Sequence, residues 1–302
     1  MLKILANDGM DKEAVKTLEA AGHSVDTTFY EGEELVKRLN EVDAVIIRSK
    51  TKIRTDLIDK VKGGTLKLII RAGVGIDNID HAYAKEQGIE VRNTPNSSSD
   101  SVAELSLAHM FTLARHLHKA NVTMKNMEWN KKDYSGTEIS GKVLGLVGFG
   151  RIAKSLAKKA MALGMTVNYC NQRNQDVNEP GCTFMSFEEI LKSSDYVSLH
   201  VPFDKEKGAL FTDREFELMK NSAYLINCAR GGVVDEEALV RALDAGQIAG
   251  AALDVFKDEP TKSEAVCKHE KISLSPHIGA STDEAQERIG TETVAVINEF
   301  FK

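Results

Sequence analysis

The chain has 302 residues, which is long for one domain and comfortable for two. It is 42% hydrophobic and 28% charged, the ordinary balance of a globular protein that builds its own hydrophobic core. The net charge of −6 at pH 7 argues against a nucleic-acid binder, whose contact surface would be basic.

The four cysteines form no C-x-x-C pair and have no metal-ligand spacing, so we expect free thiols and no metal site. The first residues, Met-Leu-Lys-Ile-Leu-Ala-Asn-Asp, reach an acidic residue too early for a signal peptide. No apolar run approaches the ~18 residues that a membrane-spanning helix needs. We therefore expect a cytoplasmic protein.

Short apolar runs alternate with amphipathic stretches along the chain, which predicts βα units and parallel sheets. In the first part, strands are predicted at 2–6, 43–48, 66–71 and 89–92, and helices at 10–21 and from about Ser99 to Lys119. The alternation then restarts, with strands at 142–147, 165–170, 196–201, 223–228, 248–255 and 271–274, and helices at 151–163 and about 282–301. Two such series predict two α/β domains of similar size.

A glycine-rich turn, G-x-G-x-x-A, follows the strand predicted at 142–147 and opens the next helix. This context favours a dinucleotide-binding turn over a glycine turn that only packs. Gly148 allows the tight turn, and Gly150 lets a pyrophosphate approach the backbone. The N–H groups near Arg151 and Ile152 would then face the phosphates, while Ala153 keeps the helix close to the strand.

The strand predicted at 165–170 ends where such a unit normally carries an acidic residue for the adenine ribose. Asn171 stands at that position. It can bind a ribose hydroxyl without repelling a 2′-phosphate, and Arg173 could attract one, so we expect NAD with some tolerance of NADP. The alternative for Asn171 is a turn-forming role at a strand end.

Three polar residues follow predicted strands in the second half of the chain: Arg230, Glu259 and His277. In open α/β sheets the ligand lies at the carboxyl ends of the strands. Arg can hold a substrate carboxylate bidentately, His can act as acid or base on a C2 oxygen, and a carboxylate beside the His would favour its protonated form. Each residue alone could be structural, but together, behind a dinucleotide turn, they predict a hydride-transfer site.

Five segments carry a family resemblance: RAGVGIDNID (71–80), LGLVGFGRIA (144–153), LINCARGGVVDEEAL (225–239), GAALDVFKDEP (250–260) and SPHIGASTDEAQ (275–286). They resemble the D-isomer-specific 2-hydroxyacid dehydrogenases over essentially the whole chain. The resemblance implies two Rossmann-like or flavodoxin-like α/β domains with parallel sheets. The substrate-binding domain would be discontinuous, 1–98 plus 281–302, around a dinucleotide-binding domain, 99–280.

The resemblance also implies roles for individual residues. Arg230 would hold the substrate carboxylate, and His277, paired with Glu259, would exchange a proton with the C2 oxygen. Asp254 would orient the nicotinamide carboxamide, and Pro202 and Cys228 would also contact the cofactor. The family further implies a homodimer built on the cofactor domains.

Within the family, three stretches resemble the members that act on a phosphorylated 2-hydroxy acid: 47–52, 93–104 and 129–138. In the first, Arg48 and Ser49 would contact substrate together with Gly73 and Val74. A dianionic phosphate needs cations, which favours this role for Arg48. The alternative for Arg48 is a surface salt bridge.

The stretch 129–138 resembles a dimer-clasping arm with Trp129 as its packing residue, although Trp129 could also pack within one subunit. Lys131 and Lys132 are candidates for facing a partner's substrate phosphate, but Asp133 interrupts the basic run. Many such members carry a C-terminal regulatory domain, and because the sequence stops at Lys302 we expect no feedback through one.

Two other functions stay open at this point. A reductase of unphosphorylated hydroxypyruvate or glyoxylate would share the whole catalytic set and differ only in the substrate loop. A nicotinamide-sensing corepressor of the same fold could also keep Arg230, Glu259 and His277.

Overall fold

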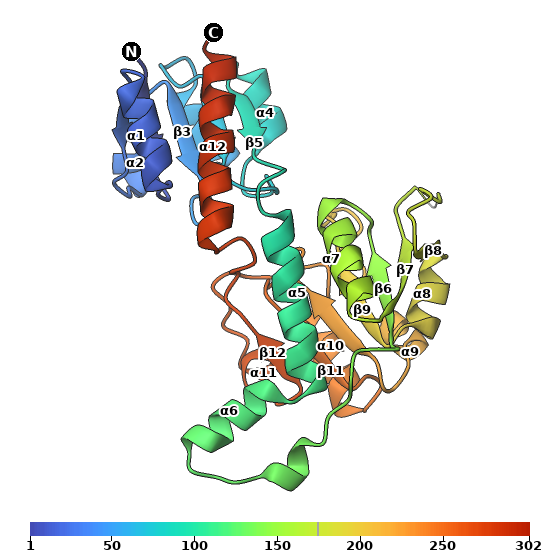
Figure 1. Cartoon of the computed structure of the whole chain (residues 1–302). Helices are drawn as coiled ribbons and strands as arrows, with labels where there is room; N and C mark the ends of the chain where they lie inside the picture. Colours follow the sequence, from blue (N-terminus) through green and yellow to red (C-terminus); the bar gives the residue numbers. More distant parts are fainter. Residues whose placement is uncertain (174) are drawn as a thin grey trace. The chain divides into compact units, whose positions relative to one another are not determined.

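A computed structural model describes residues 1–173 and 175–302 of the chain (Figure 1). The chain divides into two compact units, Met1–Ser99 with Ala280–Lys302, and Asp100–Gly279. Each unit contains one sheet, and the paired strands within each sheet run parallel. Among the described helices, none combines the length and the apolar character needed to cross a membrane.

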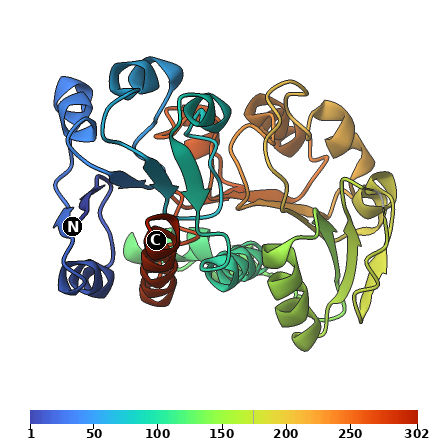
Figure 2. The ribbon, with the colours of Figure 1, turned by 90° about the horizontal axis from the view of Figure 1, so that it is seen from above.

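The first unit, unit 1, has a five-stranded sheet in the order β2-β1-β3-β4-β5, the flavodoxin-like order. Its strands are β1 (Lys3–Ala6), β2 (Ser24–Asp26), β3 (Ala44–Ile47), β4 (Leu68–Arg71) and β5 (Glu90–Asn93). Its helices are α1 (Lys12–Ala20), α2 (Gly32–Leu39), α3 (Thr55–Val61), α4 (His81–Glu86) and α12 (Asp283–Phe300). Helices cover both faces of this sheet (Figure 2).

The three central strands of unit 1, β1, β3 and β4, consist mostly of buried apolar residues. Leu5, Val45 and Ile69 pack with residues of α2, α3 and α4. Their neighbours Ile4 and Ile46 face the other way, toward α1 and α12. Burial on both faces is why these strands are continuous apolar runs rather than alternating ones.

Helix α12 packs directly on α1, although the two are far apart in sequence. A Cβ atom on Gly290 would lie 2.8 Å from the Cβ of Ala14, so only glycine lets the two helices approach this closely. Arg288 Nε also donates to the carbonyl of Ser97 at 2.8 Å. The last helix is therefore part of unit 1.

The second unit, unit 2, has a seven-stranded sheet in the order β12-β11-β10-β9-β6-β7-β8. Its strands are β6 (Val143–Val147), β7 (Thr166–Cys170), β8 (Cys182–Phe184), β9 (Tyr196–Leu199), β10 (Tyr224–Asn227), β11 (Gly250–Leu253) and β12 (Ile272–Leu274). Its helices are α5 (Ser99–Ala114, whose first residue belongs to unit 1), α6 (Leu117–Lys125), the 3₁₀ helix η1 (Lys131–Tyr134), α7 (Arg151–Ala162), α8 (Phe187–Ser193), α9 (Asp213–Leu218), α10 (Glu236–Asp244) and α11 (Glu264–Cys267). Counted from β6, this is the dinucleotide-binding order 3-2-1-4-5-6 with a seventh strand added.

The prediction of one helix from about Ser99 to Lys119 is wrong. Helix α5 ends at Ala114, and His116, with a φ of 54°, separates it from α6. The Thr137 N–H donates to the Ala114 carbonyl at 2.9 Å, and a Cβ on Gly136 would lie 2.3 Å from that same oxygen. The returning chain thus occupies the end of α5, a tertiary contact that the local pattern did not reveal.

Candidate active site

The predicted residues of unit 2 lie just beyond the carboxyl ends of successive strands of one sheet. They are Gly148 and Gly150 after β6, Asn171 after β7, Pro202 after β9, Cys228 and Arg230 after β10, Asp254 and Glu259 after β11, and His277 after β12. Because the strands are parallel, these ends share one edge of the sheet. The strand order reverses between β6 and β9, which is where open α/β sheets bind ligands.

The turn between β6 and α7 has the geometry that a pyrophosphate requires. Gly148 has a φ of 91°, and a Cβ there would lie 2.4 Å from the His200 carbonyl oxygen. Gly150 is the N-cap residue of α7, and a Cβ there would meet no atom within 4 Å. The turn is therefore tight at its first glycine and open at its second.

The start of α7 is left uncapped by side chains. Ser186, Asp235 and Ser263 cap α8, α10 and α11 with hydrogen bonds to backbone N–H groups, but α7 has no such bond and no acidic residue in its first turn. The N–H groups at Arg151 and Ile152 are thus available to an anion. The residues present fit the phosphates of a dinucleotide.

Asn171 closes the loop that follows β7. Its side-chain amide donates to the Gln175 carbonyl at 2.6 Å, and its oxygen accepts from the Gln175 N–H at 3.2 Å. One N–H and one lone pair remain for another partner. The turn-forming role weighed for Asn171 is therefore present, and ribose binding would come in addition to it.

Arg230 lies in a turn that a buried asparagine organises. Asn227 donates to the Arg230 carbonyl at 3.0 Å and accepts from the Ala229 N–H at 3.1 Å. A Cβ on Gly231 would lie 1.7 Å from the Phe256 carbonyl oxygen, so this position must be glycine for the turn to approach the loop after β11. The Arg230 guanidinium itself donates to the Ala229 carbonyl at 2.6 Å.

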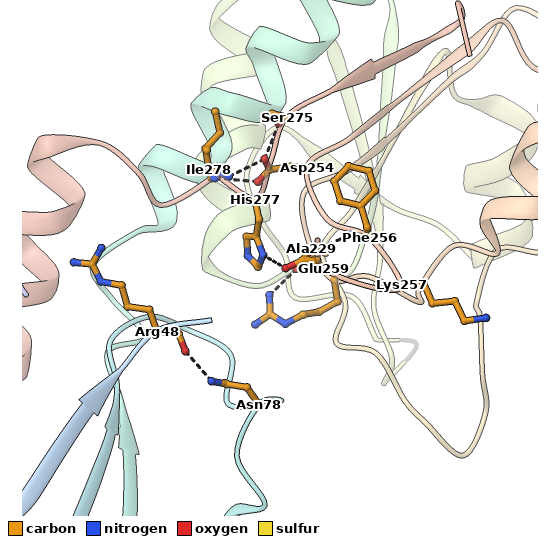
Figure 3. A network of polar contacts seen from close by, with 12 residues as sticks. Arg48, Asn78, Ala229, Asp254, Phe256, Lys257, Glu259, Ser275, His277 and Ile278 are labelled. Carbon is orange, nitrogen blue, oxygen red and sulfur yellow. Dashed lines mark hydrogen bonds and ion pairs between the residues drawn. The ribbon is translucent and has the colours of Figure 1, made fainter. Parts of the chain in front are cut away.

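His277 and Glu259 form a hydrogen-bonded pair, with 2.7 Å between Nδ1 and Oε2 (Figure 3). The other oxygen of Glu259 accepts from the Phe256 N–H at 3.2 Å. Burial by itself would raise the pKa of Glu259, but the hydrogen bond and charge of His277, the Phe256 N–H and the charge of Arg230 outweigh it and hold the pKa below its ordinary value. With Nδ1 engaged by Glu259, Nε2 is the ring nitrogen available to a substrate.

Asp254 fixes the loop that carries His277. Its carboxylate is 1% exposed and accepts from the Ser275 hydroxyl at 2.6 Å and from the N–H groups of Ile278 and Gly279, both at 2.9 Å (Figure 3). These donors flank His277, which has a φ of 54°. A carboxylate has about four acceptor positions, so one is left for a further donor such as a carboxamide.

The loop that carries Arg48 and Ser49 belongs to unit 1 and is held from two sides. Asp8 accepts from the N–H groups of Arg48 at 2.7 Å and Thr51 at 3.0 Å. Asn78 donates to the Arg48 carbonyl at 2.7 Å (Figure 3). It also donates to the Thr51 carbonyl at 2.7 Å. The backbone of this loop is therefore fixed at both of its ends.

The Arg48 side chain is half-buried at the carboxyl edge of β3. Burial lowers the pKa of its guanidinium, although Asp8 and Asp11 oppose this. Its Nε is buried and finds no hydrogen-bond partner among the described residues. A surface salt bridge thus does not account for Arg48, whereas a bound anion would satisfy it.

Gly73 and Val74 lie in the turn after β4, in the same unit. Gly73 has a φ of 147°, and a Cβ there would lie 1.5 Å from Nη1 of Arg71, so the glycine leaves room for that guanidinium. The carbonyls of Gly73 and Val74 accept from the Thr94 N–H at 3.1 Å and from Asn93 Nδ2 at 2.5 Å.

Sequence reasoning missed the residues that hold these loops in place. They are Asp8, Asn78, Asn227, Ser275 and His109. Asp8 and Asn227 had a usable signal, since each is a polar residue at the carboxyl end of a strand. His109 lies within an apolar helix pattern and carried no such signal.

Known proteins resemble this chain over its whole length. A family model, D-isomer specific 2-hydroxyacid dehydrogenase, NAD binding domain, matches residues 107–279. A hydroxypyruvate reductase of Thermotoga maritima is 40% identical over 299 residues, 98% of this chain and 97% of its own. A D-3-phosphoglycerate dehydrogenase of Methanocaldococcus jannaschii is 41% identical over 294 residues, 96% of this chain but 56% of its own.

The fold has the same kind of relatives among solved structures. The D-lactate dehydrogenase of Aquifex aeolicus, complexed with NAD and lactic acid, superposes with a TM-score of 0.84 at 31% identity and covers 99% of this chain and 95% of its own. The chain therefore belongs to the D-isomer specific 2-hydroxyacid dehydrogenase family. The predicted family, α/β fold class and NAD cofactor are confirmed. The two curated relatives are equally similar to this chain and differ in substrate, so likeness alone does not choose between their substrates.

Proposed function

We propose that the chain interconverts D-3-phosphoglycerate and 3-phosphohydroxypyruvate with NAD, as in serine biosynthesis. The observation that carries this proposal is Arg48, a half-buried guanidinium whose Nε finds no partner in the described chain. Its loop also presents the exposed Ser49 and Lys50. A substrate phosphate supplies the acceptors and the charge that these groups require.

The residues of unit 2 then perform the hydride-transfer chemistry. Arg230 holds the substrate carboxylate, and Nε2 of His277 donates a proton to the C2 oxygen during reduction or removes it during oxidation. Glu259, bonded to Nδ1, keeps the ring in that orientation and stabilises its charged form. The nicotinamide, when bound, supplies or accepts the hydride at C2.

The cofactor residues follow the same sheet edge. Gly148, Gly150 and the N–H groups at Arg151 and Ile152 hold the pyrophosphate, and Asn171 lies at the adenine ribose. Pro202, Cys228 and Asp254 lie at the nicotinamide half. This assigns substrate binding to 1–98 plus 281–302 and dinucleotide binding to 99–280.

A second candidate is reduction of hydroxypyruvate or glyoxylate, and one observation favours it. The Thermotoga hydroxypyruvate reductase matches the chain over 97% of that enzyme's length. The test is kcat/KM for 3-phosphohydroxypyruvate, hydroxypyruvate and glyoxylate, followed by NADH absorbance. We expect the phosphorylated acid to lead by roughly tenfold or more, the effect of one charge-assisted contact. A lead for hydroxypyruvate would overturn the phosphoglycerate assignment.

We also propose a homodimer formed through the arm that runs from α6 to η1. Five large apolar side chains of this arm are exposed: Leu117, Val122, Met124, Met127 and Trp129, the last two at 92% and 76%. Several exposed large apolar side chains grouped in one segment are typical of an interface. Val122→Glu with Met124→Glu should give a monomer by light scattering, while Leu163→Glu, at an exposed apolar side chain outside the arm, should leave the assembly unchanged. A monomeric native protein would contradict the proposal.

A further inference from the structure

A line of buried polar groups lies behind the loop that carries His277. His109, on α5, is 5% exposed, with Nδ1 at 3.0 Å from the Ser273 hydroxyl and Nε2 at 2.9 Å from the Ser275 hydroxyl. Ser275 in turn bonds to Asp254 at 2.6 Å. The line thus links a helix, two successive strands and the catalytic loop within unit 2.

The hydrogen bonds fix most of the donors in this line. The Asp254 carboxylate can only accept, so the single Ser275 proton is donated to it. The Ser275 oxygen must then accept from Nε2–H of His109. Burial favours the neutral ring, in which Nδ1 accepts from the Ser273 hydroxyl and His109 is the Nε2–H tautomer.

The surroundings of His109 favour its neutral form. Burial lowers the pKa of His109, and the charge of His118 acts in the same direction, while Asp254 opposes them without reversing the shift. A neutral ring with both nitrogens hydrogen-bonded holds the Ser273 and Ser275 hydroxyls at fixed positions and orientations. A leucine of similar size would fill the space but leave both hydroxyls without this partner.

The hydrogen bonds of His109 affect the position of His277 through the backbone on either side of it. Ser275 is fixed by His109 and Asp254, and Asp254 also receives the N–H groups of Ile278 and Gly279. His277 lies between these anchors in a left-handed conformation that non-glycine residues rarely adopt. In this arrangement its Nδ1 lies 2.7 Å from Glu259, and we expect that distance to depend on both flanks staying fixed.

We propose that His109 is a positioning residue for His277, acting through Ser275 and Asp254. The inference rests on the acid–base role proposed for His277. The alternative is a histidine that only fills the core, and the two differ in what a conservative replacement restores. Glutamine can place an N–H where Nε2 lies and donate to Ser275, whereas leucine restores only volume.

The experiment compares steady-state kinetics of His109→Leu, His109→Gln and the control His118→Leu. His118 donates from Nε2 to the Glu270 carbonyl at 3.1 Å, just before β12, and lies outside the line. Its charge also lowers the pKa of His109, but burial is the larger cause, so the loss of His118 should leave the neutral ring and its hydrogen bonds in place. We expect His109→Leu to lower kcat by roughly tenfold to a hundredfold, because misplacing a reacting group by up to about an ångström has an effect of that size. KM for NADH should change by less than about twofold. His109→Gln should recover most of kcat, and His118→Leu should match the native enzyme.

Amide hydrogen exchange gives a second readout that does not depend on turnover. The N–H groups of Ile278 and Gly279 should exchange at least about tenfold faster in His109→Leu than in the native protein, because their acceptor has lost its support. The His277→Ala variant is the reference for the proposed function. If His277→Ala keeps native turnover, the acid–base role of His277 is wrong. If His277→Ala is inactive but His109→Leu keeps full activity and native amide protection, only the positioning role of His109 is wrong. Equal losses in the Leu and Gln variants would also overturn it.

Discussion

The carboxyl edges of the two sheets are built in opposite ways. At the edge of the seven-stranded sheet the carboxylates are satisfied within the unit: Asp254 accepts three hydrogen bonds, and Glu259 accepts one from His277 and one from the Phe256 N–H. At the edge of the five-stranded sheet the backbone of the loop is held, but the Arg48 side chain keeps a buried Nε without a partner in the described chain.

This difference separates chemistry from recognition. A prebuilt pair can hold a proton in place before substrate arrives, whereas an unsatisfied cation gains its partner only on binding. Variants in unit 2 should therefore change turnover and its pH dependence, and variants of Arg48 should change the discrimination between substrates.

The largest expected effect is that of His277→Ala. Without the acid–base group, turnover should fall by about 10²–10⁴, because general acid–base catalysis contributes on that order. NADH binding, measured by fluorescence titration, should stay near the native value because the phosphate turn after β6 is untouched. A variant that keeps near-native turnover would remove His277 from the chemistry and with it the contrast between the two edges.

The next effect is that of Glu259→Gln on the pH profile. The pKa of Glu259 is lowered, so in the native protein its carboxylate stays ionised below its ordinary pKa, and its charge is lost only as the pH falls through the lowered value. Reduction requires protonated His277, and glutamine removes the charge that favours the protonated form. The alkaline limb of the reduction profile should therefore move to lower pH. An unmoved limb in kcat/KM against pH would contradict the pairing.

Arg48→Ala tests the carboxyl edge of the five-stranded sheet in unit 1. Its apparent KM for 3-phosphohydroxypyruvate should rise about tenfold or more, since a charge-assisted contact contributes roughly 1.5–3 kcal/mol. KM for hydroxypyruvate should change far less, and Arg48→Lys should lie between the two because lysine keeps the charge but not the fork of donors. Equal increases for both substrates would mean that Arg48 does not contact the phosphate.

The smallest effect concerns the adenine end of the cofactor site. The native protein should prefer NADH and still use NADPH measurably, because Asn171 does not repel a 2′-phosphate. Asn171→Asp should raise the ratio of kcat/KM for NADH over NADPH by severalfold, although aspartate also loses the donor to the Gln175 carbonyl and should weaken both cofactors. An unchanged ratio would place the discrimination elsewhere around the ribose.

Much of the fold followed from sequence because its signals are local. The apolar runs of the central strands and the turn at Gly148 and Gly150 carry their own patterns, so the parallel α/β class and the cofactor were predictable. The short strands β2 and β8, three residues each and only partly buried, lacked such a run and were missed. The end of α5 at Ala114 was missed because the contact that stops it comes from Thr137, across the fold.

The sequence singled out the proposed reacting groups of the candidate site but not the residues that hold them in place. Arg230, Glu259 and His277 follow predicted strands, and the structure pairs two of them at 2.7 Å. The bonds of His109 to Ser273 and Ser275 join positions 164 and 166 residues apart in sequence, and no periodicity encodes such a contact.

The packing of α12 on α1 also affects the order in which the two units fold during synthesis. Ile289 and Ile297 share a core with Ile4 and Leu18, so part of one face of the five-stranded sheet stays uncovered until α12 has left the ribosome. All of unit 2 has emerged by then, and domains generally fold as they emerge. A nascent chain stalled before Thr282 should accordingly hold a protease-resistant unit 2 beside a protease-sensitive first hundred residues. The second unit made would be the first to fold.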